Sequence, residues 1–415
     1  MTSIQKQPFS RTQQGLLAGI LALISLALMI AISPQKRCYD EFYHLNLVQD
    51  AHERGWNAAS TSPKNESAAG PLYAAIHLLA RPVTRLEAPA VRWVNYCCLL
   101  LVMVTVAASA SGGFSHPDLL AGFSLMSVPF IWPTSGMALT ELPALAAFSL
   151  FILTMKQVIQ NQEGILSFRS FSWAIASGVF LGLSVLGRQT YLVAVPVVGF
   201  MCFMIPRKWP SILLCLSVTA ISCVWLFMLW RGLVPPALSS VNGGLRLEYG
   251  ILSLSYVAAA TLFLQPNWIT LPSKGILFGV LASGVALTMV CTDYASPPAK
   301  SLLLGAFGQK AGLALGFILN SLFTTAGILW AWTAAQRAWQ SRRDPWRSFL
   351  FLTLFTLVVT PAKVSHMFST RYLVGLLGVL ILIVERPPSS PPRWYTIRIL
   401  IGSMLGAASL WTYYR

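Results

Sequence analysis

Long apolar stretches separated by short polar segments run along the whole chain. The first lies at Leu16 to Ile32, and others lie near 90–110, 118–133, 138–158, 172–187, 190–205, 210–230, 249–265, 274–291, 311–334, 347–362, 371–384 and 395–413. Because a helix needs about 20 mainly apolar residues to cross a bilayer, this pattern predicts an all-α, polytopic transmembrane protein with about 11–13 spans. Residues 172–205 would form roughly 50 Å of continuous helix, which predicts a break near Gly187 to Thr190.

Composition supports this fold class. The 415 residues are 55% hydrophobic and 10% charged, with a mean hydropathy of +0.65, whereas a soluble domain carries about 25% charged residues. A soluble multidomain protein and a disordered chain are therefore excluded. Most of the seven cysteines lie in apolar stretches, which argues against both a disulfide framework and a zinc site.

The net charge of +16 comes from 29 Lys and Arg against 13 Asp and Glu. In a membrane protein this excess indicates cytoplasmic loops, contacts with lipid headgroups or a site for lipid phosphate rather than a nucleic-acid partner. With a cytoplasmic N-terminus, Arg207, Lys208 and the basic cluster at 337–347 fall inside, and the long polar segment 33–88 falls outside. Six basic residues also fall outside, where topology does not require them: Lys36, Arg37, Arg54, Lys64, Arg81 and Arg85.

The acidic residues are concentrated in that outer segment. Five of the 13 acids lie between Asp40 and Glu66, and Asp40 and Glu41 follow the first apolar stretch by about eight residues. The sequence Phe42 to Leu45 suits a short interfacial helix that would keep these carboxylates near the membrane surface. The alternative is a solvated loop that simply collects charge.

Two charged residues further along also border apolar stretches. Glu141 begins one, where it is either a site residue or a partner of the helix dipole. Arg188 separates two of them, and an intramembrane cation costs about 2.5–3.5 kcal/mol, so it is expected to face a cavity or an ion-pair partner. Lys363, His366, Arg371 and Tyr372 precede a late span, and they fit a phosphate-binding patch better than snorkelling alone.

These residues suit transfer of a group from a lipid phosphate. A carboxylate can remove the proton from an acceptor hydroxyl as a general base, and Arg or Lys can stabilise the departing phosphate. One base without a covalent nucleophile implies a single displacement with inversion. No cofactor is required, although His44 and His52 in the acidic segment leave a weak Mg²⁺ or Mn²⁺ site open.

The chain resembles membrane glycosyltransferases of the GT-C superfamily, and within it the polyprenyl(dolichyl)-phosphate-glucose-dependent α-1,2-glucosyltransferase family. The similar segments are Asp40 to His44, Trp56, Thr61 to Pro63, Gly70 to Tyr73, Arg188 to Thr190 and, more loosely, Ser365 to Tyr372. Thr370 stands where the family has Asn, and an insertion-like stretch occupies 65–69.

The resemblance implies a polyprenyl-phosphate-sugar donor, with Asp40 or Glu41 as the base and Asp40 preferred. It also implies that Arg188 and Arg371 lie near the donor phosphate. We further expect Glu41 and Glu141 to orient the acceptor or a metal. The full set of expected substrate-binding residues is His44, Trp56, Tyr73, Glu141, Arg188, Gln189, Lys363, His366, Arg371 and Tyr372.

We therefore expect residues 1–415 to form a single integral-membrane glycosyltransferase domain. Its parts would be an outer catalytic loop at 33–88, a conserved-type module at 89–230 and a variable module at 231–415. It would transfer a hexose to a lipid-linked or glycan acceptor on the non-cytoplasmic face, as in the inner membrane of a bacterium. The alternatives are a transporter or flippase of lipid-linked sugars, or a non-catalytic scaffold subunit.

Overall fold

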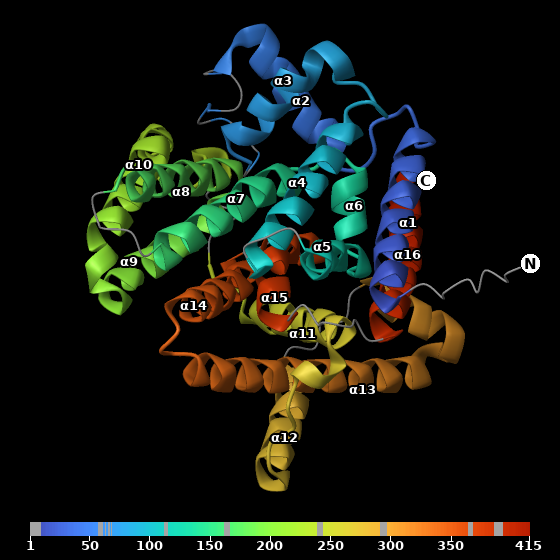
Figure 1. Ribbon diagram of the computed structural model, residues 1–415. Coiled ribbons are helices and arrows are strands. Elements are labelled where there is room, and N and C mark those ends of the chain that lie inside the picture. The colour runs from blue at the N-terminus through green and yellow to red at the C-terminus, as the bar shows by residue number, and fades with distance from the viewer. Residues whose placement is uncertain are drawn as a thin grey trace, which may run out of the picture.

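The computed structural model describes residues 10–56, 61–62, 64, 67, 69–111, 115–161, 167–238, 244–290, 297–363, 368–385 and 393–415. Within these ranges the regular structure is helical, apart from one antiparallel bridge between Ala69 and Arg188 (Figure 1). The α-helices are α1 (Arg11–Ala31), α2 (Glu41–Arg54), α3 (Pro71–Thr84), α4 (Arg92–Ser111), α5 (His116–Phe123), α6 (Ile131–Gly136), α7 (Glu141–Gln160), α8 (Phe168–Gly187), α9 (Ala194–Met204), α10 (Trp209–Trp230), α11 (Leu247–Leu264), α12 (Lys274–Val290), α13 (Pro297–Gln340), α14 (Pro345–Val359), α15 (Leu377–Val384) and α16 (Arg393–Tyr414). Short 3₁₀ helices connect them: η2 (Ser124–Ser127), η3 (Gln189–Val193), η4 (Pro206–Lys208), η5 (Pro236–Leu238), η6 (Pro266–Trp268), η7 (Thr360–Lys363) and η8 (Thr370–Leu376).

Eight helices of the described chain are long and apolar enough to cross a membrane: α1, α4, α7, α8, η4 with α10, α11, the 305–340 part of α13, and α14 with η7. Four further apolar segments are shorter, at Asp118–Ser127, Gln189–Met204, Lys274–Met289 and Thr370–Val384. The chain is thus an all-α, polytopic integral membrane protein, as its hydropathy pattern predicts.

Two predicted boundaries have different outcomes. The break near Gly187 is confirmed, because α8 ends there, Arg188 is extended and η3 follows. The stretch 118–133 is not one helix, since it is divided into α5, η2 and the start of α6. Pro129 lies between η2 and α6, and the missing N–H and fixed φ of proline interrupt a helix at that point.

The helices give the molecule two distinct ends. Helices α2 and α3 pack together and cover one end of the bundle (Figure 1). Helix α7 begins at this end with Glu141, and α8 returns to it at Gly187. The chain after α14 and the end of α16 also reach it, because Arg371 of η8 pairs with Asp40 and Tyr413 of α16 contacts Tyr39 with ring centroids 5.2 Å apart. The starts of α14 and α16 therefore lie toward the other end.

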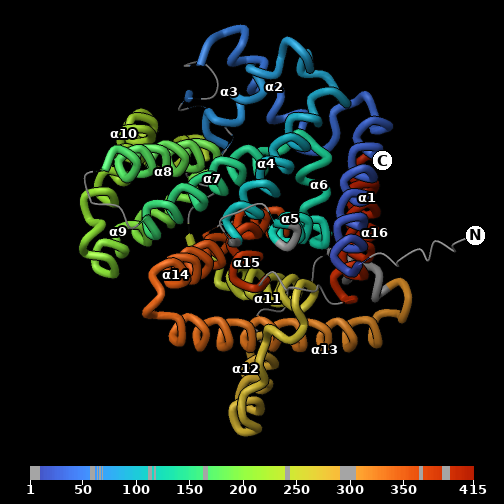
Figure 2. The backbone as a smooth tube through the Cα atoms, in the orientation of Figure 1, coloured from blue at the N-terminus to red at the C-terminus, as the bar shows by residue number. Residues whose placement is uncertain are grey.

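The core between the two ends is apolar and aromatic. Phe148 of α7 stacks on Tyr191 with ring centroids 4.3 Å apart, and Phe151 contacts Phe349 of α14 at 5.9 Å. All four rings are almost fully buried. Helices α1 and α16 run side by side along one flank of this core (Figure 2).

Candidate active site

Two acids and two arginines from four distant segments meet at the end that α2 and α3 cover. The Oδ2 of Asp40 lies 2.5 Å from Nη1 of Arg371, and Oε1 of Glu141 lies 2.5 Å from Nη2 of Arg188. Nε of Arg371 is also 3.7 Å from Oε1 of Glu141. The four charges therefore form a chain, Asp40–Arg371–Glu141–Arg188, which we call the charge cluster. The formal charges within this cluster cancel.

Exposure differs along the charge cluster. The side chain of Asp40 is 33% exposed, those of Arg371 and Arg188 are 19% and 17% exposed, and that of Glu141 is 5% exposed. The second carboxylate oxygen of Glu141 has no hydrogen-bond partner among the described residues. Asp40 is thus the most exposed carboxylate of the charge cluster, and Glu141 has a buried, unpaired oxygen.

Local backbone structure places each member of the charge cluster. Asp40 precedes α2 at the N-cap position, where Asp usually accepts a hydrogen bond from its own helix, but its side chain makes no cap and pairs with Arg371 instead. Glu141 is the first residue of α7, and its negative charge is favourable at a helix N-terminus. Arg371 lies in the first turn of η8.

Arg188 is positioned by the segment that precedes α3. The backbone of Arg188 pairs with that of Ala69. Gly70, which follows Ala69, lies so close to α8 that a Cβ at this position would be 2.0 Å from the carbonyl oxygen of Leu186. Only glycine permits this approach. The Gly-Pro-Leu-Tyr segment singled out in the sequence thus fixes the end of α8, from which Arg188 extends.

A buried aromatic column lies behind the charge cluster. The ring of His44 meets Tyr73 edge to face at 5.7 Å, and Tyr73 lies 4.3 Å from His77. The hydroxyl of Tyr73 donates to the carbonyl of Ala138 at 2.7 Å. Burial lowers the pKa of His44 to about 4, with the arginines of the charge cluster adding to this effect and its carboxylates opposing it. His44 is therefore neutral at pH 7.

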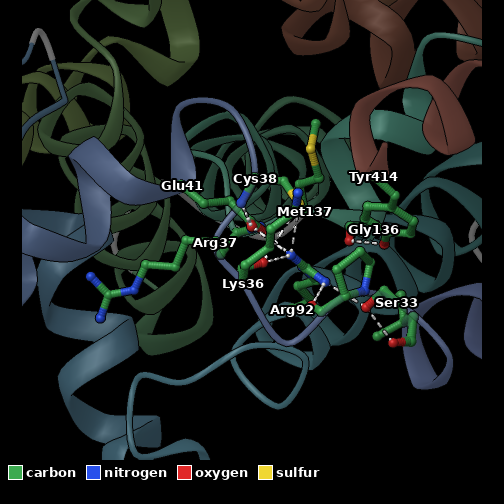
Figure 3. A network of polar contacts seen from close by, with 12 residues as sticks. Ser33, Lys36, Arg37, Cys38, Glu41, Arg92, Gly136, Met137 and Tyr414 are labelled. Carbon is green, nitrogen blue, oxygen red and sulfur yellow. Dashed lines mark hydrogen bonds and ion pairs between the residues drawn. The ribbon is translucent and has the colours of Figure 1, made fainter.

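Glu41 lies in a separate network and does not face the charge cluster. Its carboxylate is fully buried, and Nε and Nη2 of Arg92 donate to it at 2.9 and 2.8 Å. The N–H groups of Cys38 and Ala138 also donate to it, each at 2.8 Å. Figure 3 shows Arg92 between Glu41 and Ser33 in this network. With its oxygens occupied and no exposed surface, Glu41 does not have the geometry expected of a base.

The remaining predicted residues differ in their relation to the charge cluster. The ring of Tyr372 lies 5.8 Å from the guanidinium carbon of both Arg188 and Arg371, and Gln189 follows Arg188 with its buried Nε2 unpaired among the described residues. Trp56 is 39% exposed after the end of α2, and Lys363 directs its ammonium group to the carbonyl of Gly244. His366 lies outside the described residues.

Three residues that the sequence analysis did not single out complete the region. Tyr39 has a left-handed backbone with φ of 50°, and its ring lies 5.4 Å from the guanidinium carbon of Arg371. Arg92 anchors Glu41, and Tyr414 lies under Arg92 at 4.9 Å while donating to the carbonyl of Gly136 at 2.5 Å. Tyr39 was detectable as the neighbour of Asp40, whereas Arg92 resembles any cation at the start of a span.

In the charge cluster, Oδ2 of Asp40 and Oε1 of Glu141 are the carboxylate oxygens that pair with guanidinium groups. Within the described ranges, no three His, Cys, Asp or Glu side chains gather as a metal site would require.

Comparison with known proteins gives fold similarity at low identity. No protein-family model matches the chain, and no curated protein sequence matches it. Among solved structures, ArnT from Cupriavidus metallidurans in the apo state is similar at 11% identity and a TM-score of 0.48, over 94% of this chain and 76% of that chain. The same protein bound to undecaprenyl phosphate gives 12% and 0.47, over 94% and 76%.

The archaeal oligosaccharyltransferase AglB from Archaeoglobus fulgidus, in complex with an inhibitory peptide and a dolichol-phosphate, is similar at 13% identity and a TM-score of 0.49. That match covers 96% of this chain and 55% of the other. At TM-scores below 0.5, none of these similarities assigns an activity to this chain.

Proposed function

We propose that this protein is an inverting GT-C-type glycosyltransferase that transfers a hexose from a polyprenyl-phosphate-linked donor to a lipid-linked or glycan acceptor. The observation that supports this most directly is the charge cluster, in which a partly exposed carboxylate and two arginines converge at one end of a membrane bundle. We further propose that this end faces outward, that the protein resides in a bacterial inner membrane and that residues 1–415 act as one domain.

In the proposed reaction, Asp40 accepts the proton of the acceptor hydroxyl as that oxygen attacks the anomeric carbon of the donor sugar. The bond between this carbon and the phosphate oxygen breaks, and its electron pair leaves with the polyprenyl phosphate. Arg371 and Arg188 stabilise the negative charge that develops there. A single displacement of this kind inverts the anomeric configuration.

The Asp40–Arg371 pair would allow donor binding to control whether Asp40 is available as a base. A donor phosphate that binds Arg371 competes with the carboxylate of Asp40 for the same guanidinium N–H groups. Donor binding would therefore release Asp40 toward the acceptor. Glu141, with its unpaired oxygen, and His44 would then help to orient the sugar or acceptor hydroxyls.

The proposal is tested with purified protein in detergent, polyprenyl-phosphate-glucose and -mannose as donors, and extracted membrane lipids as acceptors. Release of polyprenyl phosphate is measured by mass spectrometry. Because a general base contributes about 10²–10⁴-fold, Asp40→Asn should slow release at least about 100-fold. Asp50→Asn is the matched control, since Asp50 lies on α2, the helix that Asp40 precedes, in an exposed pair with Arg54.

Two outcomes would contradict this assignment. The first is full activity of folded Asp40→Asn. The second is movement of fluorescent polyprenyl-phosphate-sugar across proteoliposomes without cleavage, which would identify a transporter. The packed aromatic core between the two ends favours the enzyme, because Phe148, Phe151 and Phe349 leave little space for a passing sugar.

A further inference from the structure

A large cavity opens at the end of the bundle opposite the charge cluster. It has a volume of about 920 Å³, and its walls include the end of α13, the start of α14, the end of α15 and the start of α16. The segment formed by η8 and α15 starts at Arg371 of the charge cluster and ends at Glu385 of the cavity, so the two sites lie at opposite ends of the same helical segment. The cavity is therefore not part of the proposed glycosyl-transfer site. Its size is within the usual range of ligand sites.

The cavity has an excess of positive charge. Its lining contains Arg337, Arg343, Arg347 and Arg398 against Asp344 and Glu385. Arg398 pairs with Glu385, and Arg347 lies 3.4 Å from Asp344. Four arginines against two carboxylates give the described lining of the cavity an excess of two positive charges.

The positive-inside rule explains only part of this arrangement. That rule accounts for exposed cations in cytoplasmic loops, such as Arg343 and Arg347. It does not account for Arg398, which is 3% exposed, or for Arg337, whose guanidinium carbon lies 4.8 Å from the ring centre of Trp268. Within the described residues, the buried Nε of Arg398 has no hydrogen-bond partner.

The remaining walls are apolar and aromatic. Leu350, Phe351, Leu382 and Ile383 line the cavity along with Trp268 and Trp394. A basic rim over an apolar wall matches an amphiphile whose anionic group binds the arginines while its chain covers the hydrocarbon surface. Basic pockets between membrane helices bind phosphate headgroups in this way, and guanidinium groups bind phosphate through paired N–H donors.

We propose that this cavity binds a phosphate-bearing anion at the end of the bundle opposite the charge cluster. The phosphate belongs either to an anionic lipid headgroup or to a free phosphate ion, and both would bind Arg337, Arg343 and Arg347. Neither source requires the proposed glycosyl transfer. Anion binding in this cavity is therefore tested independently of the role proposed for Asp40.

The test uses the full-length protein in detergent and three probes: dihexanoyl phosphatidylglycerol, dihexanoyl phosphatidylcholine and inorganic phosphate. Dissociation constants are measured by calorimetry. Saturable binding of phosphatidylglycerol at least tenfold tighter than of inorganic phosphate identifies the lipid headgroup, and equal binding of the two identifies the free ion. Arg343→Glu should weaken either interaction at least tenfold.

Arg207→Glu is the matched control. Arg207 is an exposed arginine in the η4 turn and does not line the cavity, so this variant makes the same charge change elsewhere. The proposal is overturned if no probe binds saturably, if phosphatidylcholine binds as tightly as phosphatidylglycerol, or if both variants weaken binding equally. An unchanged thermal midpoint of Arg343→Glu confirms that its binding loss is not caused by unfolding.

Discussion

Asp40 and Glu41 are neighbours in the chain, yet their carboxylates have opposite surroundings. Successive residues entering a helix point about 100° apart, so one side chain reaches the open face while the other enters the core. Asp40 is 33% exposed beside Arg371, and Glu41 is fully buried against Arg92. The sequence motif alone does not distinguish the two, because the partner that separates them, Arg92, is 51 positions away from Glu41.

Substitution of Glu41 should therefore affect stability first. Glu41→Gln leaves the buried Arg92 without a counter-charge, and breaking such a pair costs about 3–5 kcal/mol. The expected result is a lower thermal midpoint in detergent. Asp50→Asn, which removes an exposed pair with Arg54, should cost about 1 kcal/mol or less. A Glu41→Gln protein with normal stability but no transfer would instead place Glu41 in contact with substrate.

His77 predicts a dependence of stability on pH. Burial lowers its pKa to about 3, and His44 adds to this shift. Because the unfolded chain binds this proton near pH 6.5 and the folded chain does not, His77 should lower the free energy of unfolding by up to about 1.4 kcal/mol per pH unit between pH 6.5 and 3, in addition to the contribution of His44. His77→Phe should reduce that slope, as measured by thermal unfolding at pH 7, 5.5 and 4. Exposed His52 provides the control variant His52→Phe, whose slope should match that of the wild type.

At the scale of elements, the break between α8 and η3 explains why Arg188 reaches the charge cluster. The sequence predicts this break from helix length, and its polar residues at 188–190 mark the position. It does not predict the pairing of Ala69 with Arg188, because an isolated bridge has no periodic pattern. The division of 118–133 could have been predicted from Pro129 and Pro133. The prediction of one continuous stretch counted apolar residues and did not consider the effect of proline on a helix.

Substitution of Gly70 tests whether the packing of α3 against α8 holds Arg188 in position. A methyl group at this position would overlap the carbonyl of Leu186, so Gly70→Ala should push α3 away from α8 and displace Arg188. We expect at least a tenfold loss of transfer with a smaller change in thermal midpoint. Gly199→Ala, in α9 where a Cβ meets no other atom, should keep full activity. Equal activities of the two variants would show that the 69–70 contact does not position Arg188.

At the scale of the whole molecule, the sequence predicts the fold class and the convergence of Asp40, Glu141, Arg188 and Arg371. Hydropathy defines the helices, and scarce charges near span ends identify the side chains that gather where those ends meet. Lys363 and Trp56 do not follow this pattern, since their side chains have local partners or face solvent. Composition cannot show such orientations.

The proposed orientation, with the charge cluster facing outward, predicts the sidedness of labelling. Lys363 is exposed at the end of the charge cluster, and Gln340 is exposed beside the basic cavity. In intact spheroplasts, a membrane-impermeant maleimide should label Lys363→Cys above the wild-type background and leave Gln340→Cys unlabelled. Inverted vesicles should give the opposite result. Labelling of both from one side would contradict the proposed orientation.

The pairing of α1 with α16 has a consequence for biosynthesis. Helix α16 packs along α1, and its Tyr414 lies against Arg92 in the network that holds Glu41. A nascent chain that has inserted α1 to α15 still has an uncovered flank on its first helix and an incomplete anchor beneath Asp40. The network that holds Glu41 beneath the charge cluster is therefore completed only after the insertion of α16.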